Sequence, residues 1–134
     1  MIAIMNIMKN NKKVSELRHR TCFSSVSYFG YKLDILKSAM QKYLRRREFD
    51  KMLWCVAEIY LFQVYADDEK KKQATKGIIS NLINRIIVML DEEMLFIEVE
   101  KYLLTRRYIK EFEDSGRSEF IALVKVCDIM VNSR

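Results

Sequence analysis

The sequence contains no proline and only three glycines among its 134 residues. Average usage in a chain of this length would give about seven prolines and nine glycines. Because these residues punctuate turns, their scarcity excludes collagen, proline-rich linkers and turn-dense β-sandwiches. Half of the residues are hydrophobic, which is too many for a chain that is disordered throughout. The composition therefore predicts a single all-α domain with a core of its own.

Cysteine and histidine are scarce as well. Cys22, Cys55 and Cys127 are far apart and form no CxxC pair, so we expect free thiols that are buried as small hydrophobic side chains. This usage is typical of a reducing, intracellular compartment. The single histidine, His19, has no second histidine or cysteine pair at a metal-ligand spacing. We expect it to be exposed and to have no metal or catalytic role.

Other motifs that carry chemistry are absent. The glycines are at least 39 residues apart and build no phosphate-binding loop, and no uncharged apolar run is long enough to span a membrane. The acidic clusters Asp67–Glu69 and Asp91–Glu93 each fall at an expected helix start, where acids complement the helix dipole. We therefore expect no cofactor, no metal, no membrane contact and no enzymatic activity. An enzyme with an unrecognised site is the least favoured alternative.

Hydrophobic residues recur every three to four positions along most of the chain, which predicts a bundle of about five helices. The second of these is apolar on almost every side and is expected at the bundle centre, with Asp50 as its N-cap. Residues 67–76 are expected to form a charged connector. The expected helices run from Tyr31 to Leu44, over Lys51–Tyr65 and Gly77–Leu90, from Asp91 to a terminator at Asp114–Gly116, and over Ser118–Val131.

The domain organisation follows from the same pattern. Residues 1–30 have only a loose helical period and end in a serine-rich loop, so we expect a flexible or partner-dependent N-terminal segment. Residues 31–134 are expected to form the helical bundle. Their apolar pattern is still running at Arg134, which favours a fragment of a longer protein.

The positive charge is concentrated at the front of the chain. Residues 1–51 carry 12 basic and four acidic side chains, whereas residues 52–134 carry 12 and 14. Lys42, Arg45 and Arg46 share one helix face by their spacing, and Arg47 follows them. Two interpretations are open: contact with nucleic-acid phosphates, or ion pairs with acids of neighbouring helices. A second basic group is discounted because glutamates flank it: Lys101, Arg106, Arg107 and Lys110.

One stretch, Lys37–Ala57, is more specific. Its first helix carries an S-A-x-x-K-x-x-R pattern, an acidic turn follows, and the next helix places an aromatic residue beside small and apolar ones. The residues concerned are Ser38, Ala39, Lys42, Arg45, Asp50, Leu53, Trp54 and Ala57. In these features the stretch resembles the C-terminal helical domain of the MgsA/RarA-type AAA+ ATPases, relatives of clamp loaders that act at stalled replication forks. It also resembles stretches in uncharacterised proteins of large DNA viruses.

The resemblance covers about 20 residues and departs from the family where Arg46–Phe49 replaces a turn that often contains glycine or proline. It implies a collar-like helical domain for oligomerisation or partner docking in DNA maintenance. It does not imply ATP hydrolysis, because the chain has no nucleotide-binding motif. Trp54 is expected to be a large buried packing anchor whose indole N–H needs an acceptor.

Two functions follow as expectations. The first is a non-enzymatic oligomerisation or partner-docking module of a nucleic-acid-processing or viral protein, with a second copy or another protein as its partner. The alternative is a nucleic-acid-binding domain that uses the basic N-terminal third. Its contact residues would be Lys42, Arg45, Arg46 and Arg47.

Overall fold

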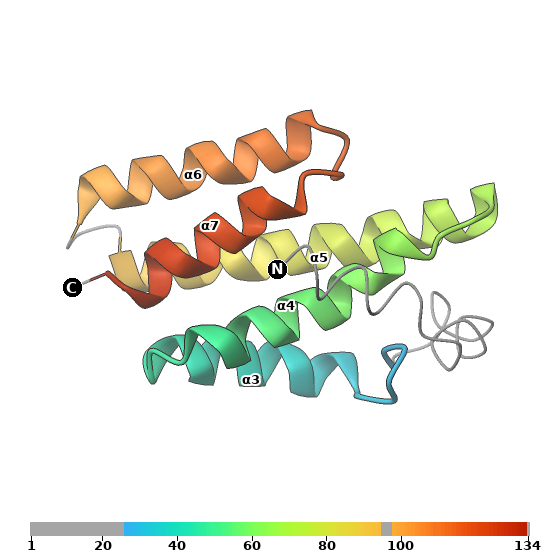
Figure 1. The fold of residues 1–134 in the computed structure, drawn as a ribbon, viewed down its shortest axis with the longest axis horizontal. Helices are drawn as coiled ribbons and strands as arrows, with labels where there is room; N and C mark the ends of the chain where they lie inside the picture. Colours follow the sequence, from blue (N-terminus) through green and yellow to red (C-terminus); the bar gives the residue numbers. More distant parts are fainter. Residues whose placement is uncertain (1–25, 95–97, 134) are drawn as a thin grey trace.

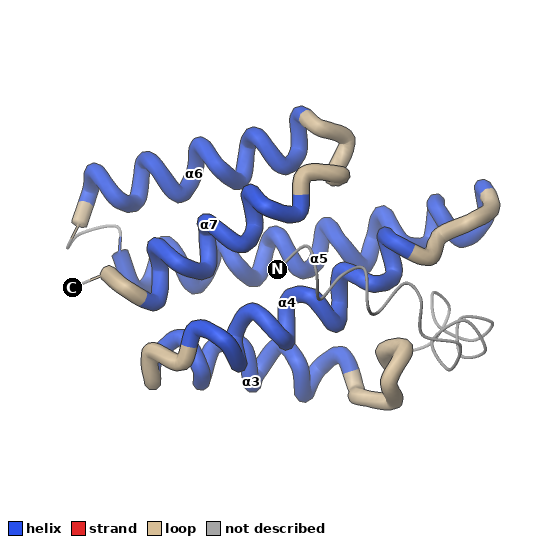
Figure 2. The backbone as a smooth tube through the Cα atoms, viewed as in Figure 1, coloured by secondary structure: helices blue, strands red, loops and turns tan. Residues whose placement is uncertain are grey.

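The computed structural model of the chain describes residues 26–94 and 98–133. These residues form a bundle of helices joined by short turns and contain no strand beyond one isolated bridge between Val26 and Lys32 (Figure 2). The predicted all-α bundle of about five helices is confirmed. Its helices are α3 (Leu33–Arg45), α4 (Phe49–Val64), α5 (Glu69–Met94), α6 (Val99–Asp114) and α7 (Phe120–Val131).

Helix α4 lies at the centre of the bundle, as its apolar sequence predicts. Ten of its 16 residues are buried, and it packs against α3, α5 and α7. Among the described helices, α3 and α6 lie at opposite edges of the bundle (Figure 1). Each therefore has one side that faces away from the other described helices.

Helix α5 is longer than the sequence predicts. It begins at Glu69 and so absorbs most of the expected connector, and Asp68 caps it by accepting the N–H of Lys71 at 2.7 Å. The helix then continues through Asp91–Glu93, where the sequence predicts the start of a new helix. That prediction is wrong, because tertiary contacts hold these acids at the unfavourable C-terminal end of the dipole. The contacts are Tyr102 Oη to Asp91 (2.7 Å), Gln41 Nε2 to Glu92 (3.5 Å) and Arg45 Nε to Glu93 (3.5 Å).

Two tight helix ends set the positions of the neighbouring helices. At the end of α3, the N–H of Glu48 donates to the carbonyl of Tyr43 and Arg47 takes a left-handed φ of 56°, which is the Schellman arrangement. Because α4 begins at Phe49 directly after this turn, Asp50 lies inside the first turn of α4. The prediction that Asp50 is the N-cap is therefore wrong. Gly116, with a φ of 71°, ends α6 at the predicted terminator.

The loop before α3 is part of the folded core. Tyr28 is buried, with its ring centroid 5.5 Å from that of Phe62 and 5.1 Å from that of Tyr65. The bundle therefore includes the last residues of the predicted 1–30 segment. The rest of that segment, residues 1–25, lies outside the described residues, and so do His19 and Cys22.

Two of the cysteines behave as the sequence predicts. Cys55 and Cys127 are free and buried. Burial raises the pKa of the Cys55 thiol to about 11 and that of the Cys127 thiol to about 12. Both thiols are therefore protonated at neutral pH and are poor nucleophiles. No helix among the described residues is both long enough and apolar enough to cross a membrane.

Candidate interaction surfaces

The structure corrects the prediction that the sequence makes for Trp54. This residue is 40% exposed, so the prediction of a buried anchor is wrong. Asp50, Trp54 and Glu58 follow one another at a spacing of four and lie on one side of α4. The ring of Tyr31, itself exposed, meets the Trp54 ring edge-on at 4.9 Å and 89°. Trp54 therefore packs on the surface of the bundle and not in its core.

Glu58 is the residue that holds Tyr31 in place. Its Oε1 accepts the hydroxyl of Ser27 at 2.7 Å and the N–H of Phe29 at 3.1 Å. The N–H of Tyr31 in turn donates to Ser27 Oγ at 3.1 Å. Glu58 is completely buried, and within the described chain its Oε2 has no hydrogen-bond partner. One carboxylate thus anchors the loop that carries the exposed aromatic ring.

Burial raises the pKa of Glu58 above its ordinary value, and the hydrogen bonds from Ser27 and Phe29 only partly oppose this. Desolvation is the larger effect because a carboxylate loses its water on both oxygens but regains donors on one. Sequence reasoning missed this residue. The available signal was a single acid in the interior of an otherwise apolar helix.

Four exposed large hydrophobic side chains come from α3, α4 and the loop before α3, and we call them the hairpin surface: Phe29, Tyr31, Ile35 and Trp54. Tyr31 and Trp54 are in contact, and the other two adjoin Tyr31 along the chain. Exposed charged residues near them in the sequence are Lys32, Asp34, Asp50 and Lys51, and Lys51 pairs with Glu48 at 3.2 Å. The four side chains of the hairpin surface itself are uncharged, and three of them are aromatic.

The predicted cationic residues of α3 are only partly brought together. Lys42, Arg45 and Arg46 line one shallow depression of about 260 Å³. Arg45 is tied to Glu93 of α5, whereas Lys42 and Arg46 are exposed and have no acidic partner among the described residues. Arg47 lines a different, small cavity next to Glu93. Two of the four predicted contact residues are thus available as free cations on one face.

Glutamates neutralise less of the second basic group than the sequence predicts. Glutamate neutralises Lys101, which pairs with Glu98 at 3.3 Å. In the described ranges, however, Arg106, Arg107 and Lys110 have no ion pair. These cations border a depression of about 600 Å³ between α5 and α6, which we call the α6 groove. Its lining residues are Ile87, Leu103, Arg106, Arg107, Ile109, Lys110 and Glu113.

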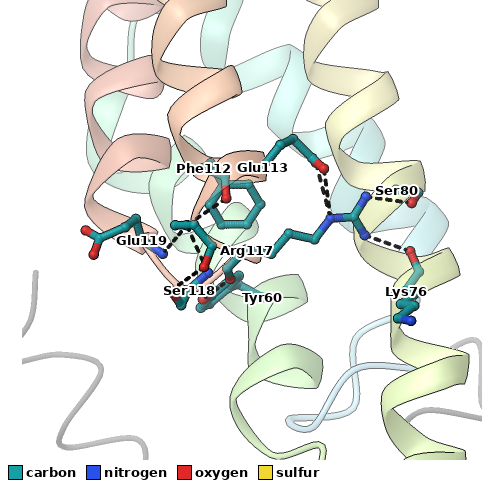
Figure 3. A network of polar contacts seen from close by, with 9 residues as sticks. Tyr60, Lys76, Ser80, Phe112, Glu113, Arg117, Ser118 and Glu119 are labelled. Carbon is teal, nitrogen blue, oxygen red and sulfur yellow. Dashed lines mark hydrogen bonds and ion pairs between the residues drawn. The ribbon is translucent and has the colours of Figure 1, made fainter.

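Glu113 pairs with Arg117, which has a left-handed φ of 66° in the turn before α7. Arg117 Nε donates to both carboxylate oxygens of Glu113 at 3.2 Å (Figure 3). Its other nitrogens donate to the carbonyl of Lys76 and the hydroxyl of Ser80, at 3.1 and 2.9 Å. The hydroxyl of Tyr60 donates to the Arg117 carbonyl at 2.7 Å. Arg117 therefore links the turn to α4, α5 and α6, and its donors serve the fold.

Within the described ranges, no three histidine, cysteine or acidic side chains converge as metal ligands would. Comparisons with protein-family models, with curated proteins and with solved structures find no match for this chain. The hairpin surface, the cationic face of α3 and the α6 groove are therefore the features from which a function can be inferred.

Proposed function

We propose that this chain is a non-enzymatic helical module that associates with a second copy of itself through the hairpin surface. The observation that carries the proposal is the exposure of Trp54, which Tyr31 holds edge-on. Tryptophan and tyrosine contribute most often to the energetic centres of protein interfaces. Because Glu58 fixes the loop that carries Tyr31, the pair is already ordered before a partner arrives, and little entropy is lost on binding.

The charge around the hairpin surface favours a second copy as the partner. A two-fold symmetric contact brings the same patch of both copies together, so a patch with net charge would repel itself. None of the four side chains of the hairpin surface is charged, and neighbouring charges of both signs are present. The resemblance of Lys37–Ala57 to a collar-like domain agrees with this reading. The proposed setting is a nucleic-acid-processing or viral assembly in a reducing, intracellular compartment.

The first prediction concerns oligomeric state. Light scattering at high protein concentration should give a mass above the monomer value of 16.0 kDa, and this mass should change little with salt because the contact is uncharged. Trp54→Ala should weaken association by at least about tenfold, since truncating an interface tryptophan commonly costs 2 kcal/mol or more.

The matched control is Ile121→Ala, because Ile121 is also an exposed large hydrophobic residue but lies on α7. It should leave the mass unchanged. Circular dichroism should show that both variants keep their helices. A wild-type chain that stays monomeric at the highest concentration reached, or an equal loss in both variants, would contradict self-association through this surface.

A second candidate function, nucleic-acid binding, is favoured by one specific observation. Lys42 and Arg46 are exposed, lack acidic partners within the described chain, and share a depression with Arg45. Phosphate contacts of this kind make affinity fall steeply with salt. Among the four residues that the sequence predicts, this pair of cations is therefore the first contact to test.

The second prediction tests this contact. Binding of a labelled DNA duplex should weaken steeply between about 50 and 200 mM salt, and replacing Lys42 and Arg46 by alanine should reduce the salt slope by about two. Arg106→Ala with Arg107→Ala removes the same charge from α6 and serves as the control. Unchanged binding after the first double substitution excludes the α3 face, and an equal effect of the control shows attraction by net charge alone.

A further inference from the structure

The exposed side of α6 carries large aliphatic side chains that no other described helix covers. Only Thr105, Ile109 and Phe112 of this helix are buried. On the exposed side, Val99 and Leu103 are 55% and 60% accessible to solvent. Exposed aliphatic side chains that follow a helical spacing indicate a docking face.

The apolar residues continue into a basic stripe on the same helix. Val99, Leu103, Arg106 and Lys110 are separated by four, three and four positions, which places them on one side of α6. Ile87 of α5 lines the same α6 groove as Leu103. The groove is shallow and open, so it is suited to a row of side chains and not to an enclosed small molecule.

The cations at the groove form no ion pair with the acids of the same helix in the described ranges. Glu113, which lines the end of the groove, has both carboxylate oxygens on Arg117 Nε (Figure 3). In the part of the chain that the structure describes, Arg106, Arg107 and Lys110 form no ion pair. Their positive charge is therefore available to a ligand whose carboxylates lie close to apolar groups.

We propose that the α6 groove binds an acidic amphipathic helix of another protein. Apolar residues of that helix, at a spacing of three and four, would pack on Leu103 and Ile87. Glutamates or aspartates at its flanks would meet Arg106, Arg107 and Lys110, which supplies charge complementarity and hence specificity and rate. A second copy of this chain does not fit, because a symmetric contact would set the same cations against each other.

The charges and the apolar floor together favour this partner over nucleic acid. A phosphate backbone would use the cations but would leave Leu103 and Ile87 without a function, and no aromatic side chain lines the groove for base stacking. The proposal is also independent of the hairpin surface, since α3 and α6 are at opposite edges of the bundle (Figure 1). Failure of one proposal therefore leaves the other intact.

The third prediction uses the full chain and a synthetic helical peptide of about 20 residues, with leucines on one face and glutamates elsewhere. Fluorescence anisotropy should detect binding of this peptide. A scrambled peptide of equal composition, which has no apolar face, should bind at least about tenfold more weakly, and a peptide with lysines in place of the glutamates should not bind.

Substitutions in the chain locate the contact. Leu103→Ala should weaken peptide binding about tenfold, and Arg106→Glu combined with Lys110→Glu should abolish it. The matched control is Leu104→Ala, which trims an exposed leucine of the same helix that does not line the groove. Equal binding of the scrambled peptide, or an unchanged affinity in Leu103→Ala, overturns the proposal. Binding of a DNA duplex that depends on Arg106 but not on Leu103 would assign the groove to nucleic acid instead.

Discussion

Phe112→Ala is expected to lower the free energy of unfolding by about 3–5 kcal/mol, the usual cost of removing a fully buried phenylalanine. Phe112 has no exposed surface, and its ring centroid lies 5.9 Å from that of Tyr60 on α4. Its carbonyl also accepts the N–H of Arg117 and the hydroxyl of Ser115. The side chain thus fastens the end of an edge helix that has only three buried residues.

Urea unfolding followed by circular dichroism tests this fourth prediction by measuring the free energy of unfolding. Hydrogen exchange shows which helix is destabilised. Because α6 has so few other anchors, its amides should lose protection before those of α4 do. Leu103→Ala serves as the control, since it trims an exposed residue of the same helix and should change stability by no more than about 0.5 kcal/mol. Similar costs for the two variants would mean that α6 does not pack on the bundle through Phe112.

The fold was predictable where the pattern is local. The spacing of hydrophobic residues identifies the helices, and the apolar sequence of α4 identifies the bundle centre. Helix ends were harder, because the meaning of an acidic cluster depends on distant partners. Asp68 begins α5 as dipole reasoning predicts, but Asp91 and Glu93 end the same helix because Tyr102 and Arg45 reach them from α6 and α3.

Trp54 and Glu58 show why burial on α4 was not predictable. They lie one turn apart on the same side of the helix, yet the tryptophan is exposed and the glutamate is buried. The difference comes from the loop before α3, whose Ser27 and Phe29 cover Glu58 while Tyr31 reaches only one edge of Trp54. A contact between residues about 30 positions apart leaves no trace in helical periodicity.

The candidate surfaces were predictable to a similar, partial extent. Spacing correctly groups Lys42 with Arg46, but the sequence does not reveal that Glu93 neutralises Arg45. On α6, by contrast, the sequence overestimates how far acids neutralise the cations. Glu113 is close in sequence to the cations of the α6 groove, but Arg117 binds both of its carboxylate oxygens. Counting neighbouring charges therefore misjudges both faces.

The fifth prediction concerns Glu58, whose removal should have a cost that depends on pH. Glu58→Ala leaves the Ser27 hydroxyl and the Phe29 N–H without their acceptor, and we expect a loss of about 2–4 kcal/mol at acidic pH. The pKa of Glu58 in the folded chain is raised above the ordinary value of 4.5. As the pH rises past 4.5, the unfolded wild-type chain releases this proton first, which stabilises the unfolded state. The wild type therefore loses stability until the folded pKa is passed.

The alanine variant has no such proton, so the gap between the two chains should narrow as the pH rises and then stay constant. Urea unfolding between pH 4 and pH 8 measures this gap, and Glu111→Ala, which removes an exposed acid, should show no comparable narrowing. Parallel profiles for the wild type and Glu58→Ala would contradict the burial of a titrating carboxyl at this position.

The single tryptophan of the chain reports on the same substitution directly. Without Glu58, the loop that carries Tyr31 loses its anchor, so the edge-on contact with Trp54 should loosen and the tryptophan emission should change. Self-association should weaken together with this change, because the hairpin surface depends on Tyr31 being ordered before binding. If Glu58→Ala alters stability but neither the emission nor the mass, the buried carboxyl supports the fold without organising the hairpin surface.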